Sequence, residues 1–275
     1  MAEAMADGMA GGAAMRRATL PNGMNVAYQT KAELAQFYDD IFVKQVYVRH
    51  GVVLADGACV FDVGANIGLF SIFAAHRARG ARVFAFEPAP PLFAILAENT
   101  LWCAGEVLLF NCGLGDREGT AELTFYPLTS GMSSFHADAG EERAALRTLF
   151  RNQAAGGAPG LDAVMRSEDQ LLDQRLLSET YPCPIRTLSG VVAEHGVSQI
   201  DLLKIDVEKS EVQVLAGIAE RDWPKVRQIV AEVHDLGDRL AAVEADLAAR
   251  GFAVSVEQEE LYRGSDRFNL YARRL

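Results

Sequence analysis

The amino-acid sequence predicts a doubly wound α/β fold: a seven-stranded, mostly parallel sheet whose last strand is antiparallel. Two observations predict it. Short apolar runs alternate with helical segments from residue 59 to residue 233, and the chain ends in two strand-like runs with a short connection. Strand and helix in alternation require crossover connections, which place parallel strands side by side with helices on both faces. A short connection permits an antiparallel hairpin instead.

The predicted strands are short, apolar and rich in β-branched residues, which is typical of strands buried on both faces. We expect strands at residues 59–63, 82–86, 107–112, 200–206, 228–233, 253–257 and 268–273. We expect helices at residues 67–79, 90–102, 188–195, 210–216 and 238–250. Gly80 and Gly251 follow two of these helices and can end them in the left-handed conformation. The architecture expected is a Rossmann-like sheet.

Three regions lie outside this alternation. Residues 1–18 are rich in Ala, Gly and Met and are expected to be disordered, with neither a signal peptide nor a membrane anchor. Residues 19–57 contain an amphipathic stretch at 31–49 and are predicted to be a helical lid before the main domain, 58–275. After a strand at 121–125, an insertion at about 127–184 carries helical pieces at 140–153 and 161–178. A glycine-rich joint at 154–160 separates these pieces, so we predict a cap that closes over the substrate.

The composition excludes some partners. With 26 Lys and Arg against 37 Asp and Glu, the net charge is −11, which disfavours nucleic acid and anionic membranes as partners. No apolar run is long enough to cross a bilayer, so a cytoplasmic protein is expected. The four cysteines are scattered without a zinc-binding spacing and are expected to be reduced.

The first predicted strand leads into the glycine-containing run FDVGANIG at residues 61–68. Glycine is required where the backbone turns sharply and approaches a ligand, and the carboxyl end of a strand is where such sheets bind ligands. The second strand ends in Glu87 and Pro88. A carboxylate there can accept hydrogen bonds from a ribose diol, although it could instead serve only as a charge at the start of a helix. The predicted cofactor-binding residues in these two turns are Asp62, Gly64, Ala65, Asn66, Gly68, Glu87 and Pro88.

The charge of the first turn distinguishes between nucleoside cofactors. A nicotinamide dinucleotide site has the pattern G-x-G-x-x-G, whereas here the first glycine is missing and Asp62 precedes Gly64 by two residues. Asp62 would repel a pyrophosphate and attract the ammonium and sulfonium of S-adenosylmethionine. The cofactor predicted is therefore S-adenosyl-L-methionine.

Several of these motifs resemble those of the FkbM-type methyltransferases. They are FDVGANIG at 61–68, FEP at 86–88, GLGD at 113–116 and KIDVE at 204–208 followed by Glu211, and the resemblance covers about residues 19–275. The chain looks similar to the O-methyltransferase domains of modular polyketide and nonribosomal peptide synthases. The resemblance implies methyl transfer to a hydroxyl, with acceptors that include polyketide chains on an acyl carrier protein. One departure is Lys209-Ser210, where the family commonly has a glycine after the Glu.

The candidate catalytic residues lie at the ends of the later strands. Asp206 and Glu208 follow the strand beside the first and should face the transferred methyl, and Asp206 is also a candidate cofactor ligand. His234 is the predicted base, because its ordinary pKa is near neutrality and Glu208 or Glu232 could orient it. Its alternative is a merely hydrogen-bonded histidine. His136 could line the acceptor pocket from the insertion, or be incidental.

Two further questions stay open at this stage. Asp116 is a candidate for adenine contact, or a simple turn aspartate. Carboxylates and a histidine at the strand ends could bind a metal, but no dedicated ligand spacing is visible, so no metal is predicted. The alternative functions are a nicotinamide-dependent reductase and a non-catalytic binding module with a methyltransferase fold.

Overall fold

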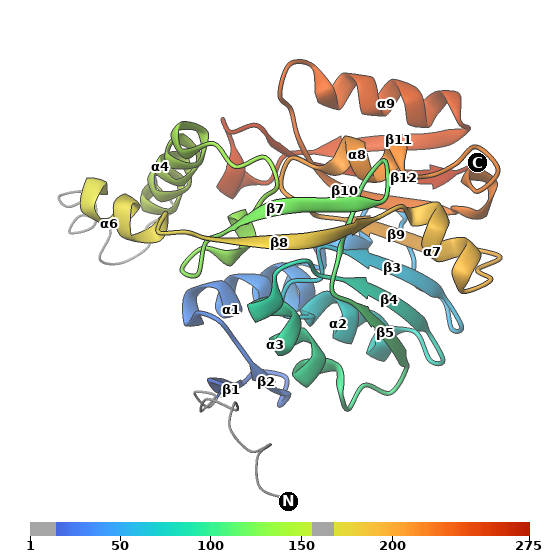
Figure 1. Ribbon diagram of the computed structural model, residues 1–275, viewed down its shortest axis with the longest axis horizontal. Helices are drawn as coiled ribbons and strands as arrows, with labels where there is room; N and C mark the ends of the chain where they lie inside the picture. The colour runs from blue at the N-terminus through green and yellow to red at the C-terminus, as the bar shows by residue number, and fades with distance from the viewer. Residues whose placement is uncertain (1–14, 156–167) are drawn as a thin grey trace, which may run out of the picture.

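Within residues 15–155 and 168–275, which this computed structural model describes, seven strands form the central sheet (Figure 1). The strand order is β11-β12-β10-β9-β3-β4-β5. Their bounds are β3 Cys59–Val63, β4 Arg82–Phe86, β5 Glu106–Phe110, β9 Leu202–Ile205, β10 Gln228–His234, β11 Phe252–Glu257 and β12 Arg267–Arg274. Strand β12 is antiparallel to both β10 and β11, and the other pairings in the sheet are parallel. The predicted fold class is confirmed.

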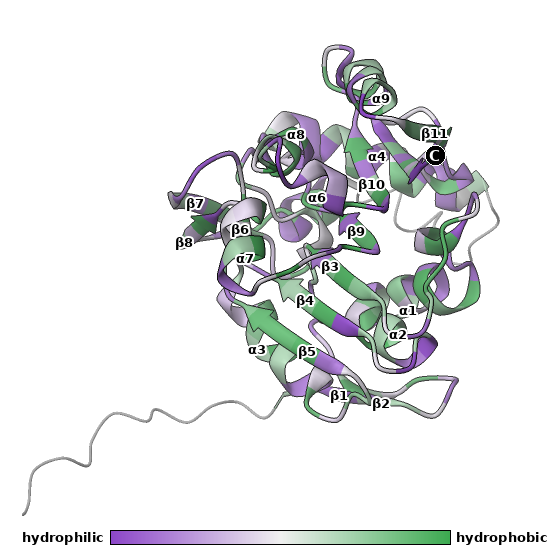
Figure 2. Cartoon of the chain, turned by 90° about the vertical axis from the view of Figure 1, so that its right-hand side faces the viewer, coloured by the Kyte–Doolittle hydropathy of each residue, from purple (hydrophilic) through white to green (hydrophobic). Residues whose placement is uncertain are grey.

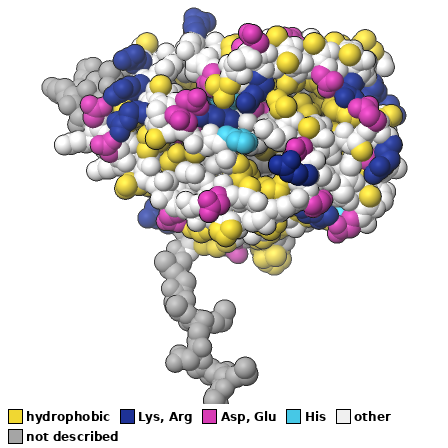
Figure 3. Space-filling view, turned by 45° about the horizontal axis from the view of Figure 1, so that its top comes forward, with side chains coloured by type: hydrophobic (Ala, Val, Ile, Leu, Met, Phe, Trp, Pro, Cys, Tyr) yellow, Lys and Arg dark blue, Asp and Glu magenta, His cyan; other side chains and the backbone are white. Residues whose placement is uncertain are grey.

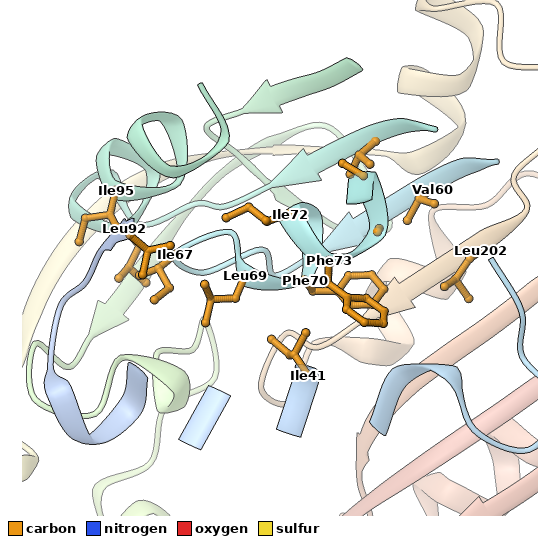
Figure 4. Close-up of a cluster of buried hydrophobic side chains, with 14 of the residues drawn as sticks. Ile41, Val60, Ile67, Leu69, Phe70, Ile72, Phe73, Leu92, Ile95 and Leu202 are labelled. Carbon is orange, nitrogen blue, oxygen red and sulfur yellow. The ribbon is translucent and has the colours of Figure 1, made fainter. Parts of the chain in front are cut away.

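Helices cover both faces of this sheet because successive side chains of a buried strand point to opposite sides. Val60 of β3 packs in one core with Phe70 and Phe73 of α2, and Figure 4 shows this cluster. Phe61, the next residue, packs in the other core with Val191 of α7. The first face carries α2 (Leu69–Arg77) and α3 (Pro90–Thr100), and the second carries α7 (Leu188–Glu194), α8 (Glu211–Ala216) and α9 (Arg239–Ala249). In Figure 2 the inner strands are accordingly mostly hydrophobic.

The N-terminal region differs from the prediction in two ways. Residues 1–14 of the segment expected to be disordered lie outside the described residues, but Arg17–Thr19 form β1, which pairs with β2 (Asn25–Ala27). The expected helix at 31–49 is divided into α1 (Lys31–Tyr38), a π-helical turn η1 (Asp39–Val43) and a 3₁₀ turn η2 (Val46–Val48). Gln45 separates the last two with φ of 53°. Because that left-handed conformation ends a helix, the chain bends back toward the sheet.

The insertion contains more strand than the sequence analysis predicted. Its strand β8 (Glu179–Arg186) pairs with the whole length of β7 (Gly119–Phe125), which precedes the insertion, and also meets β6 (Gly113–Leu114). Pro182 and Pro184 lie inside β8, and proline normally argues against a strand. Helices α4 (Ala139–Ala155) and α6 (Glu168–Arg175) stand at one end of this pair (Figure 1). The predicted joint at Gly156-Gly157 lies outside the described residues.

The surface matches the charge pattern of the sequence. On the face shown in Figure 3, acidic and basic side chains are interspersed among hydrophobic ones. Among the described helices, none is long and apolar enough to span a membrane.

Candidate active site

The central sheet reverses its strand order between β3 and β9, and a cavity of about 420 Å³ opens at their carboxyl ends. This is the position at which open α/β sheets bind ligands. Side chains predicted from the sequence form its polar floor, which includes Asn66, Glu87, Asp206, Glu208 and Glu232. The backbone of Gly64, Ala65 and Pro88 also borders it. The structure therefore brings most of the predicted residues to one place.

The turn after β3 depends on glycine. Gly64 has φ of 79°, and a Cβ atom there would lie 1.7 Å from the Asp206 carbonyl oxygen. The amides of Gly64 and Ala65 both donate to the Phe86 carbonyl, at 3.0 and 2.9 Å, which ties the turn to β4. Gly68 is also left-handed and packs on Leu96, away from the cavity. Gly64 thus allows two strand ends to approach closely, while Gly68 starts α2.

Glu87 holds the same turn from the end of β4. One of its carboxylate oxygens accepts the Asn66 amide at 2.8 Å and the other accepts the Ala89 amide at 2.9 Å. Burial, partly offset by these amide hydrogen bonds, raises the pKa of Glu87 to about 7. Since a carboxylate oxygen has two lone pairs, each oxygen can still accept one hydroxyl from the cavity.

Lys204, which the sequence analysis did not select, lies at the centre of the charges below the floor. Its ammonium donates to the Gly64 carbonyl at 2.7 Å and lies 3.1 Å from Asp62 and 3.6 Å from Asp206. Asp62 also accepts a hydrogen bond from Ser71 at 2.6 Å and does not line the cavity. Asp62 therefore supports the turn through Lys204. The sequence feature that could have pointed to Lys204 is a lysine inside the otherwise apolar run LLKI of β9.

Asp206 does face the cavity, and Tyr47 of η2 covers it. The Tyr47 hydroxyl donates to Asp206 at 2.7 Å. Although burial opposes ionisation, Lys204 and Arg267 hold the pKa of Asp206 below its usual range. Burial and the Asp206 charge raise the pKa of Tyr47. An ionised carboxylate and a neutral phenol therefore meet at this edge of the sheet.

The turn after Asp206 explains the departure from the family motif. Glu208 and Lys209 both have left-handed backbone, with φ of 46° and 74°, which glycine adopts without strain. The Lys209 ammonium reaches Glu141 at 2.8 Å and Glu142 at 3.1 Å, both on α4. In this chain the turn therefore carries a side chain that fastens the insertion to the sheet.

The structure argues against His234 as the base. Its Nε2 lies 3.0 Å from Glu208 and its Nδ1 lies 3.1 Å from Glu211. Burial opposes the charged form, but these two carboxylates raise the pKa of His234 well above its usual range. The ring is buried and does not line the cavity. A doubly hydrogen-bonded imidazolium has no lone pair for a substrate proton, so His234 is a structural cation.

Glu232 differs from its neighbours on the same floor. It pairs with Arg267 of β12, and Arg267 also lies 3.2 Å from Glu208. Burial, only partly offset by Arg267 and reinforced by Asp206, raises the pKa of Glu232 to about 8. Arg267 stacks over the Tyr262 ring at 4.3 Å. Glu232 was predicted from the sequence, whereas Arg267, the first residue of the last strand, was not.

Two predicted residues lie elsewhere. Asp116 is half exposed, its nearest charged partner is Arg117 at 3.9 Å, and it does not line the cavity. His136 is beside the site, with its amide donating to Ser134 at 3.0 Å, but its ring does not line the cavity. Phe135, one residue earlier, lines it and packs against Gly113. Gly113 and Leu114 of the motif at 113–116 therefore border the cavity, whereas Asp116 does not.

Three separate segments form the upper wall of the cavity, and most of their lining side chains are apolar. They come from α1, from η3 (Ser130–Met132) with α4, and from η5 (Glu260–Tyr262) in the last hairpin. The apolar members are Ala32, Phe37, Met132, Leu146, Leu149, Phe150 and Leu261. The N-terminal region and the insertion therefore both supply residues that line the cavity, and so does η5, for which no prediction was made from the sequence.

Hydrogen bonds join these three segments to one another. Glu33 of α1 accepts from the Ser130 hydroxyl at 2.9 Å and the Gly131 amide at 3.1 Å. Gln36 of α1 donates to the Tyr262 hydroxyl at 2.7 Å. Asn152 of α4 donates to the Leu261 carbonyl at 2.9 Å. These hydrogen bonds link the three segments, while the closing of the cap over a substrate stays a prediction.

A metal is not needed to balance the acidic floor. Ligand atoms of Glu208, Glu232 and His234 lie within 4.8 Å of one another. However, Arg267 pairs with both carboxylates, and both nitrogens of His234 already face carboxylates. Protein cations therefore occupy the positions from which a metal ion would interact, and we assign none here.

The fold is Rossmann-like, and a carboxylate-lined cavity lies where the strand order of its sheet reverses. The model of the methyltransferase FkbM domain matches residues 62–254. The chain belongs to the FkbM methyltransferase family and is a methyltransferase of that family.

Two relatives share nearly half of their aligned residues with this chain. The 31-O-demethyl-FK506 methyltransferase FkbM of Streptomyces tacrolimicus is 44% identical over 255 residues, covering 93% of this chain and 95% of that protein. The AMB antimetabolite synthetase AmbE of Pseudomonas aeruginosa is 44% identical over 260 residues, covering 92% of this chain. This chain spans only 12% of the length of AmbE.

A solved structure shows the same fold. The methyltransferase FkbM from Methylobacillus flagellatus superimposes with a TM-score of 0.50 at 16% identity, covering 82% of this chain and 46% of that one. At this identity the likeness concerns the fold alone.

Proposed function

We propose that this protein transfers a methyl group from S-adenosyl-L-methionine to a hydroxyl of a polyketide or related secondary-metabolite intermediate, free or bound to a carrier protein. The observation that carries the proposal is the division of one cavity into a carboxylate-lined floor and an apolar wall. The floor suits a cationic nucleoside, and the apolar side chains of the wall suit the hydrocarbon part of a long acceptor, beside polar groups such as Glu33 and Gln36. The relative from Streptomyces tacrolimicus is named as an O-demethyl-FK506 methyltransferase, which agrees with such an acceptor.

The residues of the floor fit this cofactor in shape and charge. Gly64 leaves the space above the turn free of side chain, and its close approach to Asp206 leaves no room for a Cβ. Glu87 keeps acceptor capacity for a ribose diol, and the ionised Asp206 supplies negative charge nearby. The cavity is also lined by Cys112, Leu114 and Phe135, which offer an apolar surface for the adenine of the cofactor. When bound, S-adenosylmethionine would supply an electrophilic methyl group on a sulfonium.

The protein's own contribution is to orient the acceptor and exclude water. Phe37, Met132 and Phe150 line the wall, and hydrogen bonds join the segments that carry them. Exclusion of water strengthens each charge interaction in the cavity. Correct alignment of an acceptor oxygen with a methyl carbon accounts for a large part of the acceleration of a displacement.

The cofactor half of the proposal is tested by ligand stabilisation. S-adenosylhomocysteine should raise the unfolding temperature, whereas NADH at the same concentration should not. Stabilisation by NADH alone would favour the nicotinamide-dependent reductase, the enzymatic alternative.

The acceptor half is tested by mass spectrometry of hydroxyacyl carrier proteins, and of the matching hydroxyacyl pantetheine thioesters, incubated with S-adenosylmethionine. A mass gain of one methyl group on either set is the expected result. Binding of S-adenosylhomocysteine without methylation of either set would favour a non-catalytic binding module, or an acceptor of another class.

A further inference from the structure

We propose that Glu232 is the general base that removes the acceptor's hydroxyl proton, and that Arg267 is the positioning residue that holds it. This inference rests on the proposed function. Its starting point is an unused oxygen: Glu232 pairs with Arg267 through Oε1, while Oε2 has no partner among the described residues. Glu232 and Arg267 both line the cavity.

The other acidic side chains of the floor are less suited to accept a proton. Glu208 has one oxygen 3.2 Å from Arg267 and the other 3.0 Å from His234, so both oxygens face cations. Asp206 accepts the Tyr47 hydroxyl at 2.7 Å, and nearby cations lower its pKa. A carboxylate stabilised in this way is a weak base. Among the described carboxylates that follow or end β9 and β10, Glu232 is the one that lines the cavity, keeps an oxygen without a partner and has a raised pKa.

The surroundings of Glu232 keep the pKa of its carboxyl group high, and they still provide a cation to balance the carboxylate's charge. Burial and the adjacent carboxylates disfavour its ionised form, while Arg267 from the neighbouring strand favours it. The result is a carboxyl group with a pKa of about 8, nearer to physiological pH than an ordinary glutamate. The titratable and charged groups that face it are Tyr47, Asp206, Glu208, His234, Tyr262 and Arg267.

Arg267 fixes the position of this base from three sides. It pairs with Glu232 and Glu208, and its guanidinium lies 4.3 Å from the centre of the Tyr262 ring. In the antiparallel pairing of β10 with β12, Arg267 lies directly opposite His234. His234 follows Glu232 by two residues on β10. The guanidinium therefore holds one oxygen of Glu232 and leaves the other without a partner among the described residues.

The proton transfer balances as follows. The acceptor's O–H bond breaks, the proton passes to Oε2 of Glu232, and the oxygen's electron pair forms the new bond to the methyl carbon. The bond from methyl carbon to sulfur breaks with its electrons kept by sulfur, which changes a sulfonium donor into a neutral thioether. Glu232 then returns the proton to solvent.

The first experiment needs no acceptor. Infrared difference spectra of the carboxyl groups, recorded as the pH is raised, should show a protonated carboxyl that ionises near pH 8 in the wild type and is absent in Glu232→Gln. Glu87 titrates near pH 7, so a Glu87→Gln variant identifies its separate signal. Glu257→Gln on β11, outside the cavity, is the matched control. An unchanged spectrum in Glu232→Gln would overturn the proposal, whatever the acceptor is.

The second experiment measures turnover with a carrier-bound or thioester acceptor that the wild type methylates. Glu232→Gln should lower kcat by about 10²–10⁴-fold with unchanged S-adenosylhomocysteine affinity, and Glu232→Asp should restore part of the rate. The wild-type rate should rise with pH to a plateau through an apparent pKa at or below 8, since a bound sulfonium favours the ionised base. Arg267→Lys keeps the positive charge but loses the two-pronged guanidinium that holds Glu232. This variant should therefore shift the apparent pKa at which the rate rises with pH. If folded Glu232→Gln turned over at the wild-type rate, the role of Glu232 would be refuted. If Arg267→Lys left the apparent pKa of the pH–rate profile unchanged, the role of Arg267 would be refuted. Failure of the proposed function would instead appear as a wild type that binds no S-adenosylhomocysteine.

Discussion

The floor and the wall of the cavity differ in how the chain supplies their residues. Most of the cofactor side of the floor comes from two adjacent parallel strands and the turns after them, within residues 61–88. The wall combines side chains from α1, α4 and η5, which are separated by more than a hundred residues of sequence. The comparison teaches that a site built from one local motif can be recognised from sequence, whereas one assembled by long-range packing cannot. The predictions below test this difference.

The largest effect is expected at Gly64, the tightest point of the floor. Gly64→Ala would place a Cβ 1.7 Å from a backbone oxygen at φ of 79°, so it should reduce the free energy of unfolding by about 4 kcal/mol or prevent folding. Gly80→Ala is the matched control, because Gly80 also has positive φ, 70°, but nothing within 4 Å of an added Cβ. It should cost only about 1–2 kcal/mol. Equal losses in urea denaturation of the two variants would mean that the Gly64 turn is less close than described.

The next effect concerns the cation between Glu208 and Glu211. His234→Gln should destabilise the fold by about 3 kcal/mol near pH 6, because it removes one of the cations paired with each of two buried carboxylates. The folded pKa of His234 is raised, so its contribution is complete below its unfolded pKa of about 6.5 and is lost as the pH rises through the folded value. The difference between wild type and variant should therefore shrink toward alkaline pH. A difference that grows with pH would show that the imidazole is neutral, and would restore it as a candidate base.

A smaller effect is expected at Glu87, on the cofactor side of the floor. Glu87→Ala should weaken S-adenosylhomocysteine binding by about 1–3 kcal/mol, the scale of hydrogen bonds to a charged acceptor. Since its pKa is about 7 and the carboxylate accepts more hydrogen bonds than the acid, wild-type affinity should fall as the pH drops through 7. Glu106→Ala, on the neighbouring strand and largely exposed, should bind normally by calorimetry. An unchanged affinity in Glu87→Ala would remove this residue from the ribose site.

The sequence predicted the sheet well because its signals are local. The strands at 59–63 and 82–86 have the expected bounds, and the alternation of strand and helix required the observed crossover topology. The strand β8 was missed because Pro182 and Pro184 normally exclude a strand, and its pairing with β7 is a long-range contact. Gln45, whose left-handed backbone divides the predicted lid helix, gives no signal in an otherwise amphipathic stretch.

The candidate site was predicted by position better than by role. Glu87, Asp206 and Glu232 were expected at the strand ends because carboxyl ends of parallel strands share one edge of a sheet. The charge states of Asp206 and Glu232 depend on Lys204 and Arg267, whose side chains reach them only in the folded protein. The same holds for His234: two carboxylates pair with it and raise its pKa, and the sequence does not show that pairing.

The smallest effect is expected from metal removal, which tests whether the acidic side of the floor is balanced by protein cations alone. The ligand atoms of Glu208, Glu232 and His234 lie within 4.8 Å of one another, close enough for a divalent cation. Arg267 pairs with both carboxylates and His234 is held as an imidazolium, so a metal ion would have to displace one positive charge and deprotonate another. Treatment with a chelator should therefore leave both S-adenosylhomocysteine affinity and methyl transfer unchanged, and added Mg²⁺ should not raise the unfolding temperature. Loss of turnover on chelation with recovery on Mg²⁺ would show that Arg267 gives way to a metal in the working enzyme. In that case Glu232 would be a ligand and not the base, and the infrared signal near pH 8 should disappear when Mg²⁺ is present.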